Sequence, residues 1–184
     1  MKFCSLYSGS SGNSLFVSNN STKILIDAGL SGKRIQSALD AIEEDPREIG
    51  GIMVTHEHSD HIHGVGVLSR RFDLPVYANE KTWEAMMKDL GKIAEHNIKI
   101  FDFEKPFNIQ DLQSKPLKHP TMQRILLALS FLTEKTSWES PPIRGLLPWR
   151  CAMLYVAVIW WYWSPTTTCR CWKLDHIPST SNSG

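Results

Sequence analysis

The sequence lacks the features that would place it in a class of proteins by composition alone. Its 20 basic and 19 acidic residues leave a net charge of +1, so no overall charge favours nucleic acid or a membrane surface as a partner. Its 4 cysteines do not have the spacing of a disulfide framework, and residues 1–6 are too short and too polar for a signal peptide. We therefore expect a cytoplasmic protein. A length of 184 residues is enough for one domain-sized core.

The sequence also has little that could cross a membrane. Its most conspicuous apolar run, residues 151–163, is shorter than the roughly 20 residues that a spanning helix needs. Pro148 and Arg150 stand where that run would have to be extended. We expect no membrane partner and keep a membrane anchor at this run only as an alternative.

The composition changes abruptly after Leu117. Residues 1–117 contain 16 acidic and 13 basic residues, whereas residues 118–184 contain 3 acidic and 7 basic residues. Most of the 7 tryptophans also lie in the second part. We therefore interpret residues 1–117 as the domain and residues 118–184 as a tail with no domain, whose polar end is typical of disorder.

Hydrophobic patterning over residues 1–117 predicts alternating strands and helices. A polar Asn-Asn-Ser turn separates the first two strands, and Ser31 is suited to cap the first helix. Apolar runs predict strands at residues 15–17, 23–27, 51–54, 74–78, 98–101 and 112–117, and helices at residues 31–42, 63–71 and 83–90. This alternation predicts a layered α/β domain.

Residues 55–61, which read Thr-His-Glu-His-Ser-Asp-His, carry the strongest functional signal in the chain. They follow the apolar run that ends at Val54, so we expect them on a loop at a strand's end, where side chains can converge in a cleft. Imidazole suits zinc and iron, and carboxylate suits harder ions such as manganese. So many potential ligands in so short a segment favour a metal site over a solvated turn with incidental histidines; they are His56, His58, Asp60 and His61.

The close spacing of these ligands predicts two metal ions rather than one. The four groups cannot all point at a single tetrahedral ion, so His56 and His58 would hold one ion, and Asp60 with His61 the other. Two ions about 3.5–4 Å apart can share a hydroxide, lower its pKa and stabilise the displaced oxygen of an ester. Zinc is the expected metal, with manganese or iron as alternatives, and Asp60 is also the candidate catalytic residue.

Other residues have both a functional and a structural interpretation. Asp27 ends a predicted strand, where its carboxylate could hold the ring N–H of a ligand histidine or simply cap a turn. Residues 8–14, Ser-Gly-Ser-Ser-Gly-Asn-Ser, could approach a phosphate through backbone N–H groups or form a plain flexible turn. We expect no metal ligation from Glu57, His63, His96, His119, His176 or the Cys-Arg-Cys segment at 169–171.

Residues 1–117 resemble the metallo-β-lactamase fold, and most closely its bacterial WalJ (YycJ) branch of cytoplasmic DNA exonucleases. The resemblance rests on residues 6–14, on Ile-Leu-Ile-Asp-Ala-Gly at 24–29, and on residues 55–64. It implies an αββα sandwich with the site at the edge between its two sheets, the two-ion assignment given above, and Asp27 as a supporting residue. It also implies a nucleic-acid substrate, with lactone, thioester or RNA hydrolysis as alternatives within the superfamily.

The resemblance implies three more ligands that the tail does not supply: a third histidine, a bridging aspartate and a C-terminal histidine. Read one base out of frame, residues 120–129, 138–145 and 158–169 can encode HDAADPVGF, GIATDTG and DLVVLESNHDV, which resemble family segments in the family's order. We therefore predict that a one-base gain or a two-base loss near codon 117 shifted the reading frame. Only the N-terminal half of the sandwich would then remain, so impaired activity or a non-enzymatic truncated product is the alternative.

Overall fold

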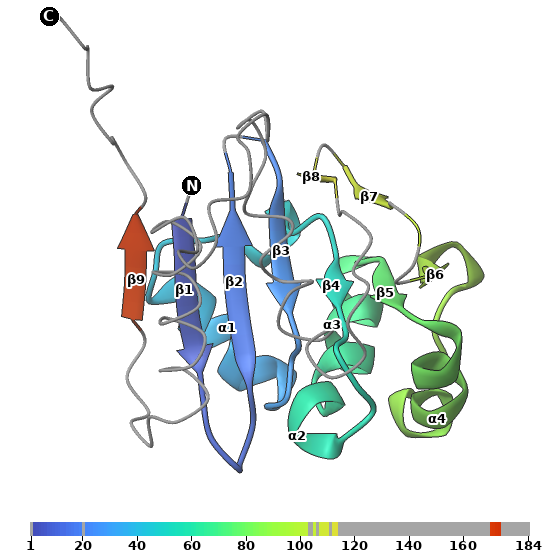
Figure 1. Cartoon of the computed structure of the whole chain (residues 1–184). Helices are drawn as coiled ribbons and strands as arrows, with labels where there is room; N and C mark the ends of the chain where they lie inside the picture. Colours follow the sequence, from blue (N-terminus) through green and yellow to red (C-terminus); the bar gives the residue numbers. More distant parts are fainter. Residues whose placement is uncertain are drawn as a thin grey trace, which may run out of the picture.

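The computed structural model describes residues 2–19, 21–102, 105, 107–110, 112–113 and 170–173. Figure 1 shows a twisted sheet with helices beside it. The elements follow in the order β1 (Lys2–Tyr7), β2 (Ser14–Ser18), β3 (Lys23–Ile26), α1 (Gly32–Asp40), η1 (Pro46–Glu48), β4 (Ile52–Met53), α2 (Ser59–Ile62), α3 (Val65–Phe72), β5 (Val76–Ala78), α4 (Glu80–Leu90), η2 (Glu95–Asn97), β6 (Ile98–Ile100), β7 (Asn108–Ile109), β8 (Leu112–Gln113) and β9 (Arg170–Lys173).

The main sheet is mixed, with the strand order β6-β5-β4-β3-β2-β1-β9, and β7 pairs with β8 in a separate small sheet. The pairs β9–β1, β1–β2 and β2–β3 are antiparallel, whereas the pairs β3–β4, β4–β5 and β5–β6 are parallel. Parallel strands end at the same edge of a sheet, and ligand sites of such sheets form beyond that edge. The segments that leave β3 and β4 therefore begin side by side, and α2 lies just beyond them (Figure 1).

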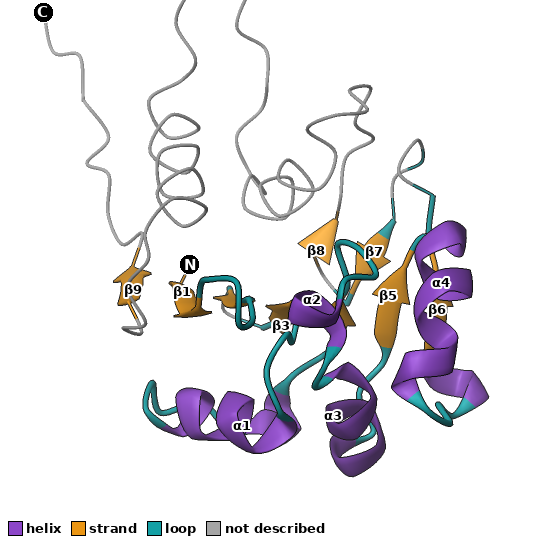
Figure 2. Ribbon diagram, turned by 90° about the horizontal axis from the view of Figure 1, so that it is seen from below, coloured by secondary structure: helices purple, strands orange, loops and turns teal. Residues whose placement is uncertain are grey.

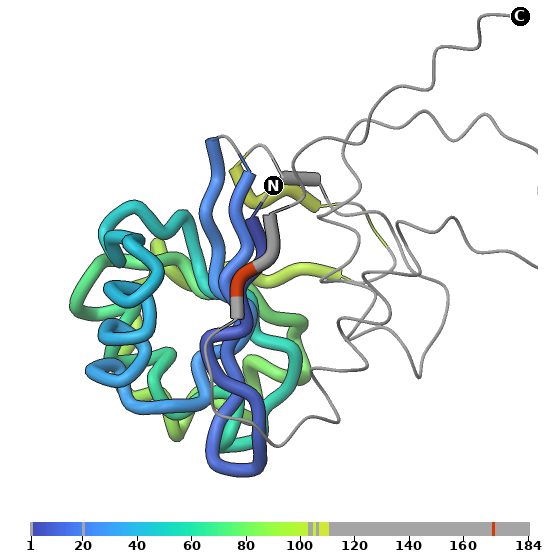
Figure 3. Tube along the Cα trace, turned by 90° about the vertical axis from the view of Figure 1, so that its left-hand side faces the viewer, coloured from blue at the N-terminus to red at the C-terminus, as the bar shows by residue number. Residues whose placement is uncertain are grey.

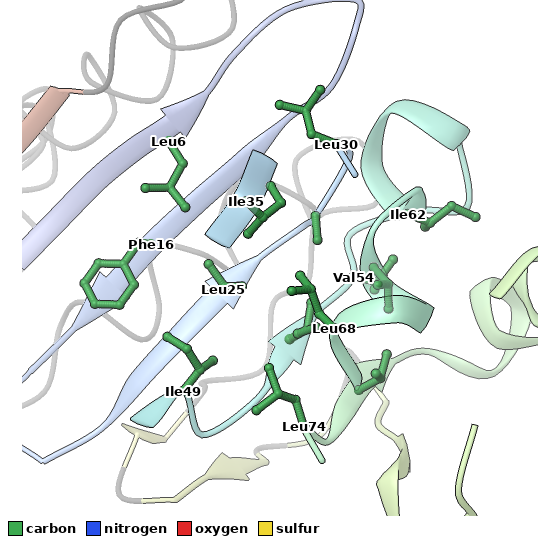
Figure 4. Close-up of a cluster of buried hydrophobic side chains, with 14 of the residues drawn as sticks. Leu6, Phe16, Leu25, Leu30, Ile35, Ile49, Val54, Ile62, Leu68 and Leu74 are labelled. Carbon is green, nitrogen blue, oxygen red and sulfur yellow. The ribbon is translucent and has the colours of Figure 1, made fainter. Parts of the chain in front are cut away.

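The hydrophobic core lies between the sheet and the helices. Helices α1 and α3 cover the same face of the sheet in Figure 2, and the edge-on view in Figure 3 shows the helical layer to one side of the strands. Leu25 of β3, Ile35 of α1 and Leu68 of α3 are fully buried together in this cluster (Figure 4). Each such side chain stabilises the fold by about 1.5–3 kcal/mol relative to an exposed position. The core therefore fixes the ends of β3 and β4, from which the candidate site extends.

Most of the predicted elements are present. The predicted α/β class is confirmed, and the sheet with one helical layer corresponds to one half of an αββα sandwich. The helix predicted from about residue 63 to residue 71 is present as α3, and Gly64 separates it from α2. A Cβ atom at Gly64 would lie 2.2 Å from the Leu30 carbonyl oxygen, so the two backbones approach more closely than any other residue allows. Strand β1 was not predicted.

The tail contributes one described strand. Strand β9 pairs with β1, and a disulfide joins Cys4 to Cys171, with Cα atoms 4.1 Å apart. The cysteine spacing gave no sign of this bond, because its partners are 167 residues apart. The apolar run at residues 151–163 and the predicted strand beyond residue 113 lie outside the described residues. In the part of the chain that the structure describes, no helix is long and apolar enough to cross a membrane.

Candidate metal centre

The predicted ligand segment is held at the sheet edge by backbone hydrogen bonds. Beyond β4 the chain forms a loop and then α2, so Asp60 and His61 lie on a short helix rather than on the predicted loop. The Ala28 N–H donates to the His61 carbonyl, and the Asn13 N–H donates to the Asp60 carbonyl, both at 2.8 Å. A helix of four residues is not stable by itself. These contacts with the segments next to β2 and β3 therefore fix the positions of both predicted ligands.

Gly29 lies where the segment after β3 crosses α2. A Cβ atom added there would lie 1.7 Å from the Asp60 carbonyl oxygen and 2.6 Å from the Asn13 nitrogen. We expect Gly29→Ala to push α2 away from β3 and to lower the free energy of unfolding by about 3 kcal/mol, measured by urea unfolding. In the control Gly9→Ala nothing lies within 4 Å of the added carbon, and only its backbone conformation costs about 1 kcal/mol. Equal losses in both variants would contradict the close packing.

The side chain of Asp27 connects the β3 end to the ligand segment. It is 1% exposed, and its Oδ1 atom accepts a hydrogen bond from the Thr55 N–H at 2.8 Å. Its Oδ2 atom accepts from the Thr55 hydroxyl and from the His61 Nδ1–H, each at 2.7 Å. The φ angle of Asp27 is 59°, a left-handed conformation that occurs disproportionately at functional sites. The Asp27 carboxylate therefore orients both Thr55 and the His61 ring.

Thr55 extends this orientation to His56. An ionised carboxylate only accepts hydrogen bonds, so the Thr55 hydroxyl donates its single hydrogen to Asp27. The His56 Nδ1 atom lies 2.9 Å from the same hydroxyl oxygen and must donate its own N–H to it. The neutral rings of His56 and His61 therefore both carry their proton on Nδ1. Each ring then has its lone pair on Nε2, the atom that can bind a metal.

The Nε2 atom of His61 faces two polar side chains. Asp60 Oδ2 lies 3.5 Å from it, and the Asn13 amide nitrogen lies 3.2 Å from it and 3.1 Å from Asp60 Oδ2. With metal–ligand distances near 2.1 Å, two donors at the Asp60–His61 separation can bind one ion. The ring centroid of His56 lies 3.8 Å from that of His61 and 4.7 Å from that of His58. The structure thus brings all four predicted ligands into one cluster.

The chemistry of this cluster fits divalent metal ions, but its coordination is incomplete. Imidazole nitrogen and carboxylate oxygen are both zinc ligands. Asp60 with His61 would hold one ion, and His56 with the exposed His58 would hold the other. Among the described residues no group of three or more His, Cys, Asp or Glu side chains is placed to hold an ion. Each pair therefore needs further ligands to complete a four-coordinate site.

We expect Thr55→Val to weaken zinc binding about tenfold while leaving the fold intact. Valine has the shape of threonine but removes the hydroxyl that Asp27 and His56 share. The His56 ring would lose the contact that fixes its tautomer. Competition titration with a chromogenic zinc chelator measures the affinity. Thr55→Ser keeps the hydroxyl and should bind zinc as the parent chain does; weakening of equal size in both variants would contradict this role.

The structure describes only some of the remaining residues noted in the sequence. Glu57 is half-buried, His63 is exposed, and the His96 ring is 2.8 Å from Asp73 Oδ1, which lowers the pKa of that carboxyl. His119, His176 and Cys169 lie outside the described residues. Sequence reasoning missed the roles of Asn13 and Thr55. Their only signals were membership of the Ser-Gly segment and a position next to His56, because their partners lie 28 to 48 residues away in the chain.

The chain is similar to proteins of one superfamily. A family model described as the metallo-beta-lactamase superfamily matches residues 7–132. The exodeoxyribonuclease WalJ of Streptococcus pneumoniae is 48% identical over 122 residues, which cover 64% of this chain and 45% of the relative. The exodeoxyribonuclease YycJ of Bacillus anthracis is 40% identical over 156 residues, which cover 80% of this chain and 59% of the relative. The chain thus spans about half the length of these curated relatives.

Solved structures of metallo-β-lactamases resemble this chain only weakly. The subclass B3 metallo-β-lactamase BJP-1 of Bradyrhizobium japonicum is 17% identical and has a TM-score of 0.47, covering 58% of this chain and 46% of that one. The family model and the YycJ alignment both extend past Leu117, where the sequence predicted the end of the domain. Because the family model matches more than half of the sequence, the chain belongs to the metallo-β-lactamase superfamily.

Proposed function

We propose that the site is that of a phosphodiesterase acting on DNA, of the exonuclease type, with two divalent metal ions. The observation that carries the proposal is the contact of His61 Nδ1 with buried Asp27 at 2.7 Å, with His61 Nε2 facing Asp60 at 3.5 Å. A ligand histidine held through its other ring nitrogen is the arrangement that metal sites use. The similarity to WalJ and YycJ, both named exodeoxyribonucleases, supports DNA as the substrate. The cytoplasmic location expected from the sequence belongs to this proposal.

The residues of the chain would have separate tasks. The bound ions would supply the positive charge that activates water and stabilises the negative charge developing on a phosphodiester. Asp27 holds the His61 ring, and Thr55 transmits this orientation to His56. The Asn13 amide donates to Asp60 Oδ2 and keeps that carboxylate beside His61. Asp60 would act as a metal ligand that touches the reacting centre. Zinc is the proposed metal, with manganese or iron as alternatives.

The test is release of nucleotides from linear DNA labelled at either end. We expect slow hydrolysis that stops when the metal is removed with EDTA and returns on addition of zinc or manganese. The end from which the label first disappears gives the polarity. Hydrolysis of a lactone, a thioester or RNA without hydrolysis of DNA would replace the proposed substrate but retain the metal site. Hydrolysis of DNA that is insensitive to EDTA would contradict the metal-dependent mechanism.

A second candidate is a product with little or no enzymatic activity. It is favoured by three segments of residues 118–184 that, read one base out of frame, can encode family-like sequence in the family's order. We propose that a frame shift removed the remaining metal ligands and that this chain therefore binds fewer than two ions. Resequencing the gene across codons 110–135, a window that includes the end of the family match, tests this. An unbroken single frame there, or two tightly bound ions per purified chain, would contradict it.

A further inference from the structure

A polar pocket adjoins the candidate metal centre. Its volume is about 310 Å³, at the lower end of the range for small-molecule sites. Most of the residues that line it are polar, and they include Ser10, Ser11, Ser31, Arg34, His63 and the predicted metal ligand Asp60. Asp60 belongs both to this pocket and to the cluster around His61. A group bound in the pocket would therefore lie directly beside the reacting centre.

Arg34 is the cation of this pocket. It lies on the exposed side of α1, and its guanidinium carbon is 5.3 Å from the centre of the Tyr7 ring. Among the described residues no carboxylate forms an ion pair with it. The planar guanidinium presents several N–H donors in a fork that matches two oxygens of a phosphate. The contact with the Tyr7 ring restricts the positions that this fork can take.

The serine hydroxyls around Arg34 add neutral donors. Ser31 stands at the N-cap position of α1, but its side chain makes no capping hydrogen bond there. Ser10 and Ser11 are exposed on the segment between β1 and β2. Hydroxyl groups can donate to oxygens of an anion without adding charge. Beside the Asp60 carboxylate, the pocket thus offers a cationic donor and neutral hydroxyl donors suited to an oxyanion.

The charge of the pocket depends on the neighbouring metal. The positive charge of Arg34 and the negative charge of the Asp60 carboxylate offset each other. Each divalent ion bound at Asp60 would add two positive charges. The site then becomes attractive to an anion, and DNA carries one negative charge per phosphate. We expect phosphate binding in this pocket to require metal.

We propose that this pocket binds a phosphate group of the DNA strand next to the one that is hydrolysed, with Arg34 as its main ligand. The inference rests on the proposed function, because DNA supplies the neighbouring phosphate. Along one DNA strand, each phosphate is joined to the next through a single nucleoside, so the two lie close together. A pocket that shares Asp60 with the metal centre is therefore placed for the adjacent phosphate.

The test compares binding of a short fluorescent single-stranded DNA to the full chain and its variants, by anisotropy with manganese present. We expect Arg34→Gln to weaken binding about tenfold and to lower the salt dependence by about one charge. Arg34→Lys keeps the charge but not the fork, so an intermediate loss is expected. Lys33→Gln is the matched control: Lys33 is exposed on the same helix and does not line the pocket, so a loss below about threefold is expected.

Oligonucleotides with and without a 5′-phosphate distinguish the two sources of phosphate. An Arg34 effect that needs the 5′-phosphate assigns the pocket to the strand end, and an effect on both oligonucleotides assigns it to an internal phosphate; either supports the proposal. Equal weakening by Arg34→Gln and Lys33→Gln overturns the pocket but leaves a metal-dependent DNA hydrolase standing. Absence of DNA binding by the parent chain that still binds zinc overturns both the pocket and the proposed substrate.

Discussion

His61→Ala is expected to weaken zinc binding by at least about 100-fold and to reduce metal-dependent DNA hydrolysis by a similar factor. In the described part of the chain, His61 is the residue that touches Asp27, Asp60 and Asn13 together. Its removal takes away one metal donor and releases Asp60 from its neighbour. Isothermal titration with zinc measures the affinity, and the end-labelled DNA assay measures hydrolysis.

In the His61→Ala variant, a loss of folding must be distinguished from the loss of one metal-binding side chain. His61 is buried, so alanine leaves a cavity beside the Asp27 carboxylate. Thermal unfolding with and without zinc makes the distinction: the parent chain should be stabilised by zinc, and a folded His61→Ala chain should not. His96→Ala is the matched control, because His96 is exposed and pairs with Asp73 away from the ligand cluster. Equal zinc affinity in both variants would contradict the assignment of His61.

Asp27→Asn should weaken zinc binding by about 10–100-fold, although Asp27 touches no metal in this account. Asparagine tolerates the left-handed backbone conformation of Asp27, so the β3 end keeps its shape. The carboxylate accepts three hydrogen bonds from Thr55 and His61. The Thr55 N–H can only donate, so the amide oxygen of asparagine stays at the Oδ1 position and its NH₂ group faces the Thr55 hydroxyl and His61 Nδ1. His61 can then keep a hydrogen bond only by moving its proton to Nε2, which removes the lone pair that binds metal.

Nuclear magnetic resonance of ¹⁵N-labelled histidine reports the tautomer of His61 directly. The parent chain should show protonation at Nδ1 and the Asp27→Asn variant protonation at Nε2. Asp40→Asn is a suitable control, because Asp40 is exposed at the end of α1. Unchanged tautomer and unchanged zinc affinity in Asp27→Asn would show that Asp27 has only a structural role at the end of β3.

Strands and helices that have a clear apolar pattern of their own could be predicted from the sequence. The apolar runs around Phe16 and Leu25 gave β2 and β3, and the spacing of Ile35 and Leu39 gave α1. Strand β1 was missed because Ser5 interrupts its apolar pattern, and its position depends on pairing with β2. Pairing with β2, rather than a local sequence pattern, therefore defines β1.

The candidate site was predictable in its residue types but not in its connections. The clustering of histidines and aspartate in residues 55–61 is visible in the sequence, whereas α2 forms only because Asn13 and Ala28 bind its carbonyls. Thr55 could not be assigned a role from its position, because its hydroxyl bonds to a carboxylate that is 28 residues away. The approach of Gly29 to Asp60 likewise appears only when two strand ends meet at the sheet edge. Long-range contacts of this kind leave no periodic signal in the sequence.

The central claim, that the segment from His56 to His61 binds metal through imidazole and carboxylate, is tested most directly by X-ray absorption at the zinc edge of the zinc-loaded chain. We expect nitrogen and oxygen neighbours near 2.0–2.1 Å with the outer-shell scattering of at least two imidazole rings. The competing donors in the sequence are cysteine sulfurs, and Cys151 and Cys169 lie outside the described residues. A spectrum dominated by sulfur near 2.3 Å, or one without imidazole scattering, would contradict the claim.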